Sequence, residues 1–385
     1  MIYLDYNATT PIDPRVFQAM EPFLRSSSER YGNPSSGHRI GQNAKEGIER
    51  SRNQVASLLG CSSSEVIFTS GGTESDNLAI SGYALAHRDK GDHIITSQIE
   101  HDAVLNTCRN LEKTGFQITF LPVNEKGCVD LDEMVKEITE NTILISIMHA
   151  NNEVGAIQPL REIGEIARER GIAFHTDAVQ AVGKIETKVD EIGCDLLSLS
   201  AHKIYGPKGV GVLYVRSKDG KPLPLHPLFH GGPHERGIRA GTENVPGIAG
   251  LGQSCEIALT EMDEEGKRLR RLRERLMVGF RKEGFEFAIH GDLDHALPGT
   301  LNLSIPEIEG EALLQALDLE GICVSTGAAC ESGSIEPSHV LLAMGVPREV
   351  AKRAIRISLG RMTHEEEIDR AIKIFSKIVD RLLDI

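Results

Sequence analysis

The chain has 385 residues, and its 42 Lys and Arg against 56 Asp and Glu give a formal net charge of −14. Binding to phosphate backbones needs a basic surface, so this balance, without any Lys- or Arg-dense tract, excludes nucleic acid as a main partner. The longest apolar stretch, residues 143–148, is far shorter than the ~20 residues of a membrane-spanning helix, so no membrane segment is expected.

The cysteines and the first residues indicate a cytoplasmic protein. Seven cysteines are scattered along the chain without any CxxC spacing, which argues against a zinc ribbon or a thioredoxin-type motif. Such usage is typical of a reducing compartment, where most thiols are small core side chains. The start of the chain also lacks the basic and apolar regions of a secretory signal.

Strand-like and helix-like segments alternate through the first two thirds of the chain. Strands are expected, in chain order, at residues 66–69, 93–97, 117–122, 142–149, 172–176, 195–200 and 209–215. Helices are expected at residues 73–86, 102–113, 130–138 and 160–170. This alternation implies βαβ units, so the predicted fold class is α/β with a mostly parallel, seven-stranded sheet.

The pattern changes from about residue 261. A charged helix is expected over residues 261–283, with Leu269, Leu272 and Leu276 along one side. Shorter strands are expected at residues 285–290, 300–305, 322–325 and 355–359, followed by a last helix with one apolar face. We predict a large domain over residues 15–262 and a smaller α+β domain made of residues 1–14 and 263–385.

Residues able to do chemistry follow five of the predicted strands. In an open parallel sheet, ligands bind beyond the carboxyl ends of the strands. The residues found there are Gly71-Gly72-Thr73, Glu100-His101, Asn151-Asn152-Glu153, Asp177 with Gln180, and Ser200-Ala201-His202-Lys203. Each alone has an ordinary explanation, such as a glycine turn, a helix cap, a core histidine or a solvated lysine. Together, a phosphate-type turn, an Asp and a Lys suit pyridoxal phosphate: Lys forms a Schiff base, Asp keeps the ring nitrogen protonated, and a helix N-terminus holds the phosphate.

Five longer motifs occur in order over nearly the whole chain. They are Tyr3-Leu-Asp-Tyr-Asn-Ala-Thr-Thr-Pro11, Thr69-Ser-Gly-Gly-Thr-Glu-Ser-Asp-Asn77, Ser200-Ala-His-Lys-Ile-Tyr-Gly-Pro-Lys-Gly209, His230-Gly-Gly-Pro-His-Glu-Arg-Gly-Ile-Arg-Ala-Gly-Thr242 and Thr326-Gly-Ala-Ala-Cys330. With them the sequence resembles cysteine desulfurases of the NifS/IscS type, which have the PLP-dependent transferase fold type I of class V aminotransferases. The resemblance implies pyridoxal 5'-phosphate as the cofactor, L-cysteine as the substrate and a homodimer.

The resemblance also implies a role for each matching residue. Lys203 would hold the cofactor and move protons, and His101 would stack on its ring and assist acid–base steps. Asp177 would pair with the pyridinium, and Gln180 would hydrogen-bond the ring hydroxyl. Further cofactor-binding residues would be Gly72, Thr73, Asn152, Ser200, His202 and, from the second subunit, Thr242. Arg356, together with Asn152, would bind the substrate carboxylate, a task that suits the planar guanidinium.

Cys330 distinguishes sulfur chemistry from transamination. It lies among small residues, whereas Cys323 has apolar neighbours. A thiol in such a loop can attack the sulfur of a cofactor-bound cysteine and leave as a persulfide, with alanine as the other product. We expect an iron–sulfur scaffold protein as the sulfur acceptor. Two alternatives remain: a selenocysteine lyase or another class V enzyme, and a non-catalytic docking subunit in which Cys330 ligates a shared [2Fe-2S] cluster.

Overall fold

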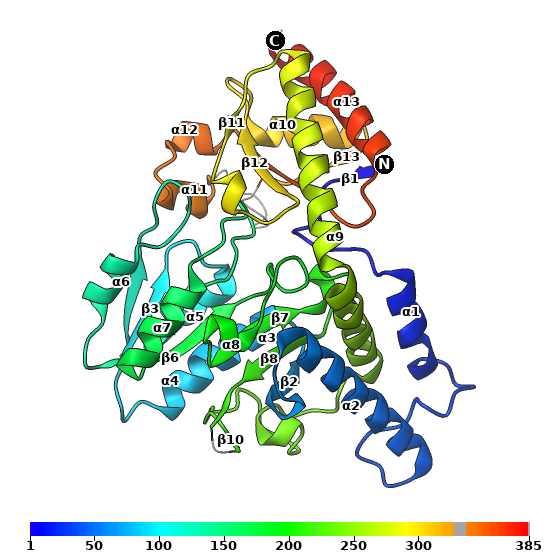
Figure 1. Ribbon diagram of the computed structural model, residues 1–385, viewed down its shortest axis with the longest axis vertical. Helices are drawn as coiled ribbons and strands as arrows, with labels where there is room; N and C mark the ends of the chain where they lie inside the picture. The colour runs from blue at the N-terminus through cyan, green and yellow to red at the C-terminus, as the bar shows by residue number, and fades with distance from the viewer. Residues whose placement is uncertain (219, 327–335, 384–385) are drawn as a thin grey trace.

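A seven-stranded sheet forms the centre of the larger part of the computed structural model (Figure 1). The structure describes residues 1–218, 220–326 and 336–383. In spatial order the strands are β2 (Val66–Thr69), β8 (Gly211–Val215), β7 (Leu196–Ser200), β6 (Ala173–Asp177), β5 (Thr142–Ser146), β3 (His93–Ser97) and β4 (Gln117–Leu121). Six of them run in one direction and β8 opposes them. The predicted α/β fold with a mostly parallel sheet is therefore confirmed.

The two faces of this sheet carry separate apolar cores. On one face, residues such as Phe174 and Leu197 pack with apolar side chains from α2 (Arg39–Leu59), α6 (Leu131–Glu137), α7 (Leu160–Arg170) and the start of α9 (Val245–Glu283). On the other face, Ala173 and Leu196 pack with α4 (Tyr83–Ala86) and α5 (Asp102–Glu112). Successive strand residues point to opposite faces, so strands buried on both sides consist of continuous apolar runs. That is why the sequence located these strands well.

Helix α9 is long enough to join both parts of the molecule (Figure 1). It begins at Val245, so the predicted start at residue 261 is wrong. Asn244 caps its first turn, and the glycines that follow obscured the helical pattern because glycine disfavours a helix interior. A Cβ atom at Gly252 would lie only 2.7 Å from the Cα atom of Ser51 in α2. The missing side chain therefore lets these two helices pack closely.

A second apolar core lies around the other half of α9. It contains a three-stranded antiparallel sheet of β11 (Ala288–Ile289), β12 (Thr300–Ser304) and β14 (Ala354–Ser358), covered by α10 (Gly310–Leu319) and α13 (Glu365–Leu383). The start of the chain joins this core, because β1 (Ile2–Tyr3) pairs in parallel with β13 (Ile322–Cys323). The domain boundary between residues 262 and 263 stays a prediction, and α9 crosses it without a break.

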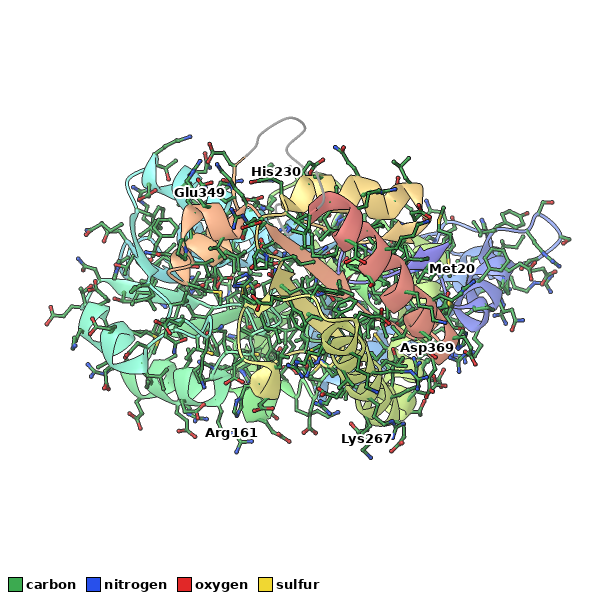
Figure 2. The ribbon with its side chains drawn as sticks, turned by 90° about the horizontal axis from the view of Figure 1, so that it is seen from above. Met20, Arg161, His230, Lys267, Glu349 and Asp369 are labelled. Atoms are coloured by element: carbon green, nitrogen blue, oxygen red, sulfur yellow. The ribbon has the colours of Figure 1, made fainter. Side chains whose placement is uncertain are left out.

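The outer faces of α9 and α13 are charged. Arg275 of α9 pairs with Asp369 of α13 at 2.7 Å, and Figure 2 shows Asp369 and Lys267 at the surface of the molecule, seen from above. Ile372, Phe375 and neighbouring apolar residues of α13 are buried on the opposite side of that helix. Among the helices that the structure describes, none is long and apolar enough to span a membrane.

Candidate active site

The carboxyl ends of five strands lie along one edge of the large sheet. Strands β2, β3, β5, β6 and β7 run parallel, so the segments that follow them meet at this edge. Asp177 is the last residue of β6, Ser200 is the last residue of β7, and Lys203 ends the short 3₁₀ turn that follows. The structure thus brings these predicted site residues together.

The turn after β2 has a backbone that requires glycine. Gly71 has φ +152° and ψ −175°, a region that is accessible to almost no other residue. Helix α3 (Gly72–Asn77) begins directly after it, and the first N–H groups of a helix have no partners within the helix. A Cβ atom at Gly71 would lie 3.8 Å from Ser200 Oγ. Backbone N–H groups at Gly72 and Thr73 and the Ser200 hydroxyl therefore surround a place suited to an anion.

The amine of Lys203 is held by backbone carbonyl groups of the N-terminal segment. Its Nζ donates to Asn7 O at 2.6 Å and to Ala8 O at 2.9 Å. Burial, assisted by the charge of Arg356, lowers the pKa of Lys203 to about 8, while Asp177 acts in the opposite direction. An amine with this pKa is partly neutral near neutral pH, so it can act as a nucleophile towards a carbonyl group.

The carboxyl group of Asp177 is buried close to two potential cations. Its Oδ1 accepts a hydrogen bond from Val179 N at 2.9 Å. Burial raises the pKa of Asp177, and His101 and Lys203 oppose this rise. His101 itself is exposed and caps α5 by accepting from Ala103 N at 3.1 Å. A cation placed against Asp177 would stabilise its ionised form.

A second acid lies beneath Asp177. Burial, followed by the charge of Asp177, raises the pKa of Asp76 well above its usual value. His175 Nε2 is 3.6 Å from Asp76 Oδ1, but burial lowers the pKa of His175 to about 3. The imidazole is therefore neutral at physiological pH, and we do not count this contact as an ion pair.

Gln180 and His202 both contact the N-terminal segment. Gln180 Nε2 donates to Asn7 O at 2.9 Å. His202 Nδ1 lies 3.1 Å from Thr9 Oγ1, and burial, followed by the charge of Lys203, lowers the pKa of His202 to about 4. His202 is therefore neutral at physiological pH, so it can take part in a hydrogen bond without adding charge.

Arg356 lies in β14, on the side of the site formed by the second core. It is 2% exposed, its Nη2 donates to Asp5 Oδ1 at 2.7 Å and its Nη1 donates to Asn152 O at 3.1 Å. Its Nε has no hydrogen-bond partner among the described residues. The guanidinium therefore has one buried donor, Nε, without a partner among the described residues. A bound carboxylate would accept from this donor, while Asp5 accepts from Nη2. Asn152 contacts Arg356 through its backbone carbonyl group.

One predicted residue lies outside this group, and another is not among the residues that the structure describes. Thr242 is exposed and lines a separate pocket with Thr69, Ser70 and Arg239, so its action from a second subunit stays a prediction. Cys330 falls outside the described residues, as does its predicted role as a [2Fe-2S] ligand. Within residues 1–218, 220–326 and 336–383, no group of three or more His, Cys, Asp or Glu is placed to hold a metal ion.

Sequence reasoning missed three residues of the site, namely Asp5, Asn7 and Lys184. Asp5 and Asn7 belong to the first quoted motif, but no local pattern relates them to their contacts, which are distant in the sequence. Asn7 Nδ2 donates to Asn152 O at 3.1 Å and to Thr300 Oγ1 at 2.9 Å, while its backbone O accepts from Lys203. Their place in the first motif is the sequence signal that could have identified Asp5 and Asn7 as site residues. Asn7 belongs to the site because it connects both parts of the molecule.

Comparisons with known proteins agree with this geometry. Residues 2–371 match the family described as Aminotransferase class-V. A curated protein of Dictyoglomus turgidum named Cysteine desulfurase IscS is 51% identical over 381 residues, which cover 99% of this chain and 95% of the relative. A solved structure described as a NifS-like protein has a TM-score of 0.91 and 42% identity, and covers 99% of both chains. Another, described as SspA in complex with cysteine, has a TM-score of 0.83 and 38% identity, and covers 94% of this chain and 99% of its own.

Proposed function

Because the chain belongs to the aminotransferase class-V family, we propose that it is a cysteine desulfurase that uses pyridoxal 5'-phosphate. It converts L-cysteine to L-alanine and retains the sulfur as a persulfide on Cys330. The observation that carries the proposal is the placement of Lys203 and Asp177 at neighbouring strand ends, in a chain that is 51% identical to a named cysteine desulfurase. Proteins of this family use pyridoxal phosphate, which agrees with the predicted cofactor.

The side chains at the site fit this cofactor. Lys203 has a lowered pKa of about 8, so a fraction of its amine is free to form the covalent link. Asp177 is a buried carboxylate able to hold the proton of the ring nitrogen, and Gln180 has an N–H group for the ring hydroxyl. The phosphate would be held by Gly72, Thr73, Ser200 and His202. When bound, pyridoxal phosphate accepts electrons from the substrate Cα, which makes the C–S bond of cysteine breakable.

The chain's own residues supply binding, proton transfer and a nucleophile. Arg356 and Asn152 hold the substrate carboxylate, and Lys203 and His101 move protons at the substrate. The Cys330 thiolate attacks the substrate sulfur, and the Cβ–S bond breaks with its electron pair remaining on carbon. Protonation of that carbon gives alanine, and the sulfur stays on Cys330 as a persulfide.

The partners belong to the same proposal. The enzyme acts as a homodimer in the cytoplasm, with Thr242 completing the phosphate site of the second subunit. An iron–sulfur scaffold protein accepts the sulfur, so the enzyme serves iron–sulfur cluster assembly. The acidic net charge of −14 supports the prediction that nucleic acid is not a partner.

Alanine formation from L-cysteine, measured with added pyridoxal phosphate, tests the proposal. We expect Lys203→Ala to lose the absorbance of the bound cofactor, and Cys330→Ala to retain it but lose alanine and persulfide formation. Cys323→Ala is the matched control, because Cys323 pairs with β1 in the second core and should leave activity unchanged. Alanine formation by Cys330→Ala at the wild-type rate would refute the assigned nucleophile.

The remaining outcomes separate the alternatives. Cofactor binding without alanine from L-cysteine would refute the desulfurase, and turnover of selenocysteine would then identify a lyase. An iron–sulfur cluster spectrum that disappears in Cys330→Ala, without alanine formation, would identify a docking subunit.

A further inference from the structure

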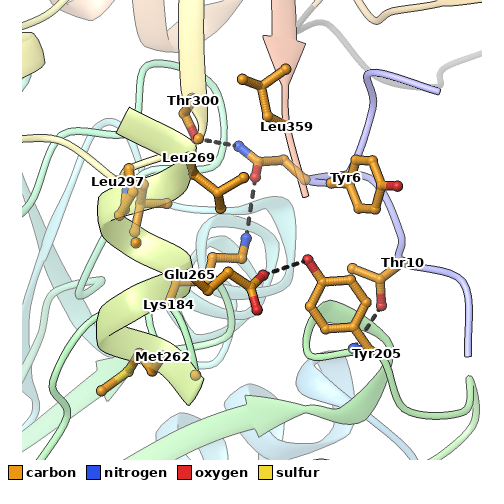
Figure 3. Close-up of a pocket in the computed structure, with 15 residues that line it drawn as sticks. Tyr6, Thr10, Lys184, Tyr205, Met262, Glu265, Leu269, Leu297, Thr300 and Leu359 are labelled. Atoms are coloured by element: carbon orange, nitrogen blue, oxygen red, sulfur yellow. Dashed lines mark hydrogen bonds between the residues drawn. The ribbon is translucent and has the colours of Figure 1, made fainter. Parts of the chain in front are cut away.

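Lys184 is a second amine beside Lys203 to which the proposed function assigns no role. Its Nζ donates to Gln180 Oε1 at 2.7 Å and to Asn7 Oδ1 at 3.1 Å. Figure 3 shows the Lys184 amine among the side chains that line a pocket, with one of its hydrogen bonds drawn as a dashed line. Burial is the main cause that lowers the pKa of Lys184 to about 7, and the charges of Lys203 and Arg356 add to it.

The hydrogen bonds of Lys184 determine how two carboxamide groups are oriented. An ammonium group only donates, and a neutral amine still has two N–H groups, which match the two oxygens that face it. The Oε1 of Gln180 and the Oδ1 of Asn7 must therefore point to Lys184. If either amide were rotated by 180°, its NH₂ group would face the amine, and a buried hydrogen bond would be lost.

This orientation extends to Lys203 through Asn7. With its oxygen towards Lys184, Gln180 directs Nε2 to Asn7 O at 2.9 Å, and the same carbonyl oxygen accepts from Lys203 Nζ at 2.6 Å. Gln180 and Asn7 are 5% and 3% exposed, so bulk water cannot readily replace a missing partner. Because Nε2 of Gln180 carries two N–H groups, one can donate to the ring hydroxyl of the cofactor while the other donates to Asn7 O.

We propose that Lys184 is a positioning residue of the cofactor site: it fixes the amide orientations of Gln180 and Asn7, and thereby the hydrogen bonds offered to pyridoxal phosphate and to Lys203. The inference rests on the proposed function, since it assumes that Gln180 and Lys203 contact this cofactor. It adds to the site a residue that acts through its hydrogen-bond partners Gln180 and Asn7.

The test measures the dissociation constant of pyridoxal phosphate from the apo-protein by absorbance titration. Lys184→Met removes both donated hydrogen bonds while keeping an unbranched side chain, and we expect affinity about tenfold weaker, the scale of one lost orienting hydrogen bond. Lys113→Met is the control, because Lys113 is an exposed lysine at the far end of α5 from His101, and the cofactor affinity of this variant should change less than about twofold. The pH at which the bound cofactor's absorbance changes should also shift in Lys184→Met but not in the control, since the Lys203 environment is altered.

A double-mutant cycle separates positioning from simple structural support. If Lys184 acts in part through Gln180, then Lys184→Met weakens cofactor binding by a smaller factor in the Gln180→Leu background than in the wild type. Fully additive losses, or unchanged affinity and pH response in Lys184→Met, would overturn the inference while leaving the proposed function intact. Wild-type protein that neither binds pyridoxal phosphate nor forms alanine would refute both. If Lys184→Met does not fold, Lys184→Gln, which keeps one amide donor, should show an intermediate loss, and wild-type affinity there would also overturn the inference.

Discussion

Replacing Glu235 with Gln tests the buried ion pair beneath the turn that begins at Gly71. Arg52 Nη1 and Nη2 each donate to one Glu235 oxygen at 2.8 Å, and Phe68 N in β2 donates to the same carboxylate at 2.9 Å. The side chains of Arg52 and Glu235 are only 6% and 2% exposed. Solvent therefore screens the pair little. Glu235→Gln leaves the buried guanidinium with only the half-exposed Glu49 carboxylate, 3.3 Å from Arg52 Nε, as a counter-charge.

The magnitude follows from this burial. Removing one partner of a buried pair costs about 3–5 kcal/mol of stability. The fraction of molecules in which β2 is locally unfolded then rises roughly 100- to 5000-fold. Hydrogen exchange of peptides covering Val66–Thr69, measured by mass spectrometry, should accelerate by a factor in this range. Glu29→Gln is the control, because its pair with Arg39 has side chains 57% and 74% exposed and contributes less than about 1 kcal/mol. An acceleration below about tenfold in Glu235→Gln would refute the reasoning, since it corresponds to less than about 1.4 kcal/mol.

Three further predictions concern pH, helix packing and substrate binding. Burial raises the pKa of Glu100 from 4.5 to about 8, so the folded state binds the proton of this carboxyl group more tightly, and wild-type stability falls as the pH rises from about 4.5 to about 8. In urea unfolding, Glu100→Gln should therefore gain stability relative to the wild type when the pH is raised from 5 to 9. An equal stability difference between variant and wild type at pH 5 and pH 9 would contradict this expectation. Gly252→Ala places a Cβ atom 2.7 Å from Ser51 and should lower the free energy of unfolding by about 1–3 kcal/mol, measured by urea unfolding. The Cβ atom of the control variant Gly37→Ala meets nothing within 4 Å, so its free energy of unfolding should stay near that of the wild type. A Gly252→Ala variant more stable than the wild type would show that α2 and α9 can move apart at little cost. Arg356→Lys keeps the charge but loses the planar guanidinium, which can donate two parallel hydrogen bonds to a carboxylate. Steady-state kinetics should therefore show a KM for L-cysteine about tenfold higher or more, with unchanged cofactor affinity. An unchanged KM would show that Arg356 does not bind the substrate.

Local sequence patterns predict the large sheet and the position of its reactive edge. Parallel strands buried on both faces need apolar residues at consecutive positions, and short runs of this kind are visible at residues 172–174 and 196–197 without any tertiary information. Because ligands bind beyond strand ends, the same runs indicated Asp177 and Lys203 as neighbours. The structure places both there, and their roles in catalysis stay predictions.

The distant residues that complete the site become evident only in the folded chain. Asp5 and Asn7 bind Arg356 and Lys203 across about 350 and 200 residues of sequence, and no periodicity describes such contacts. The start of α9 was missed for a related reason, since Gly252 is unfavourable in an isolated helix but is needed where α2 packs against it. Local propensity records the preference of a segment for its own backbone conformation, whereas close packing and hydrogen bonding between segments depend on how the whole chain is folded.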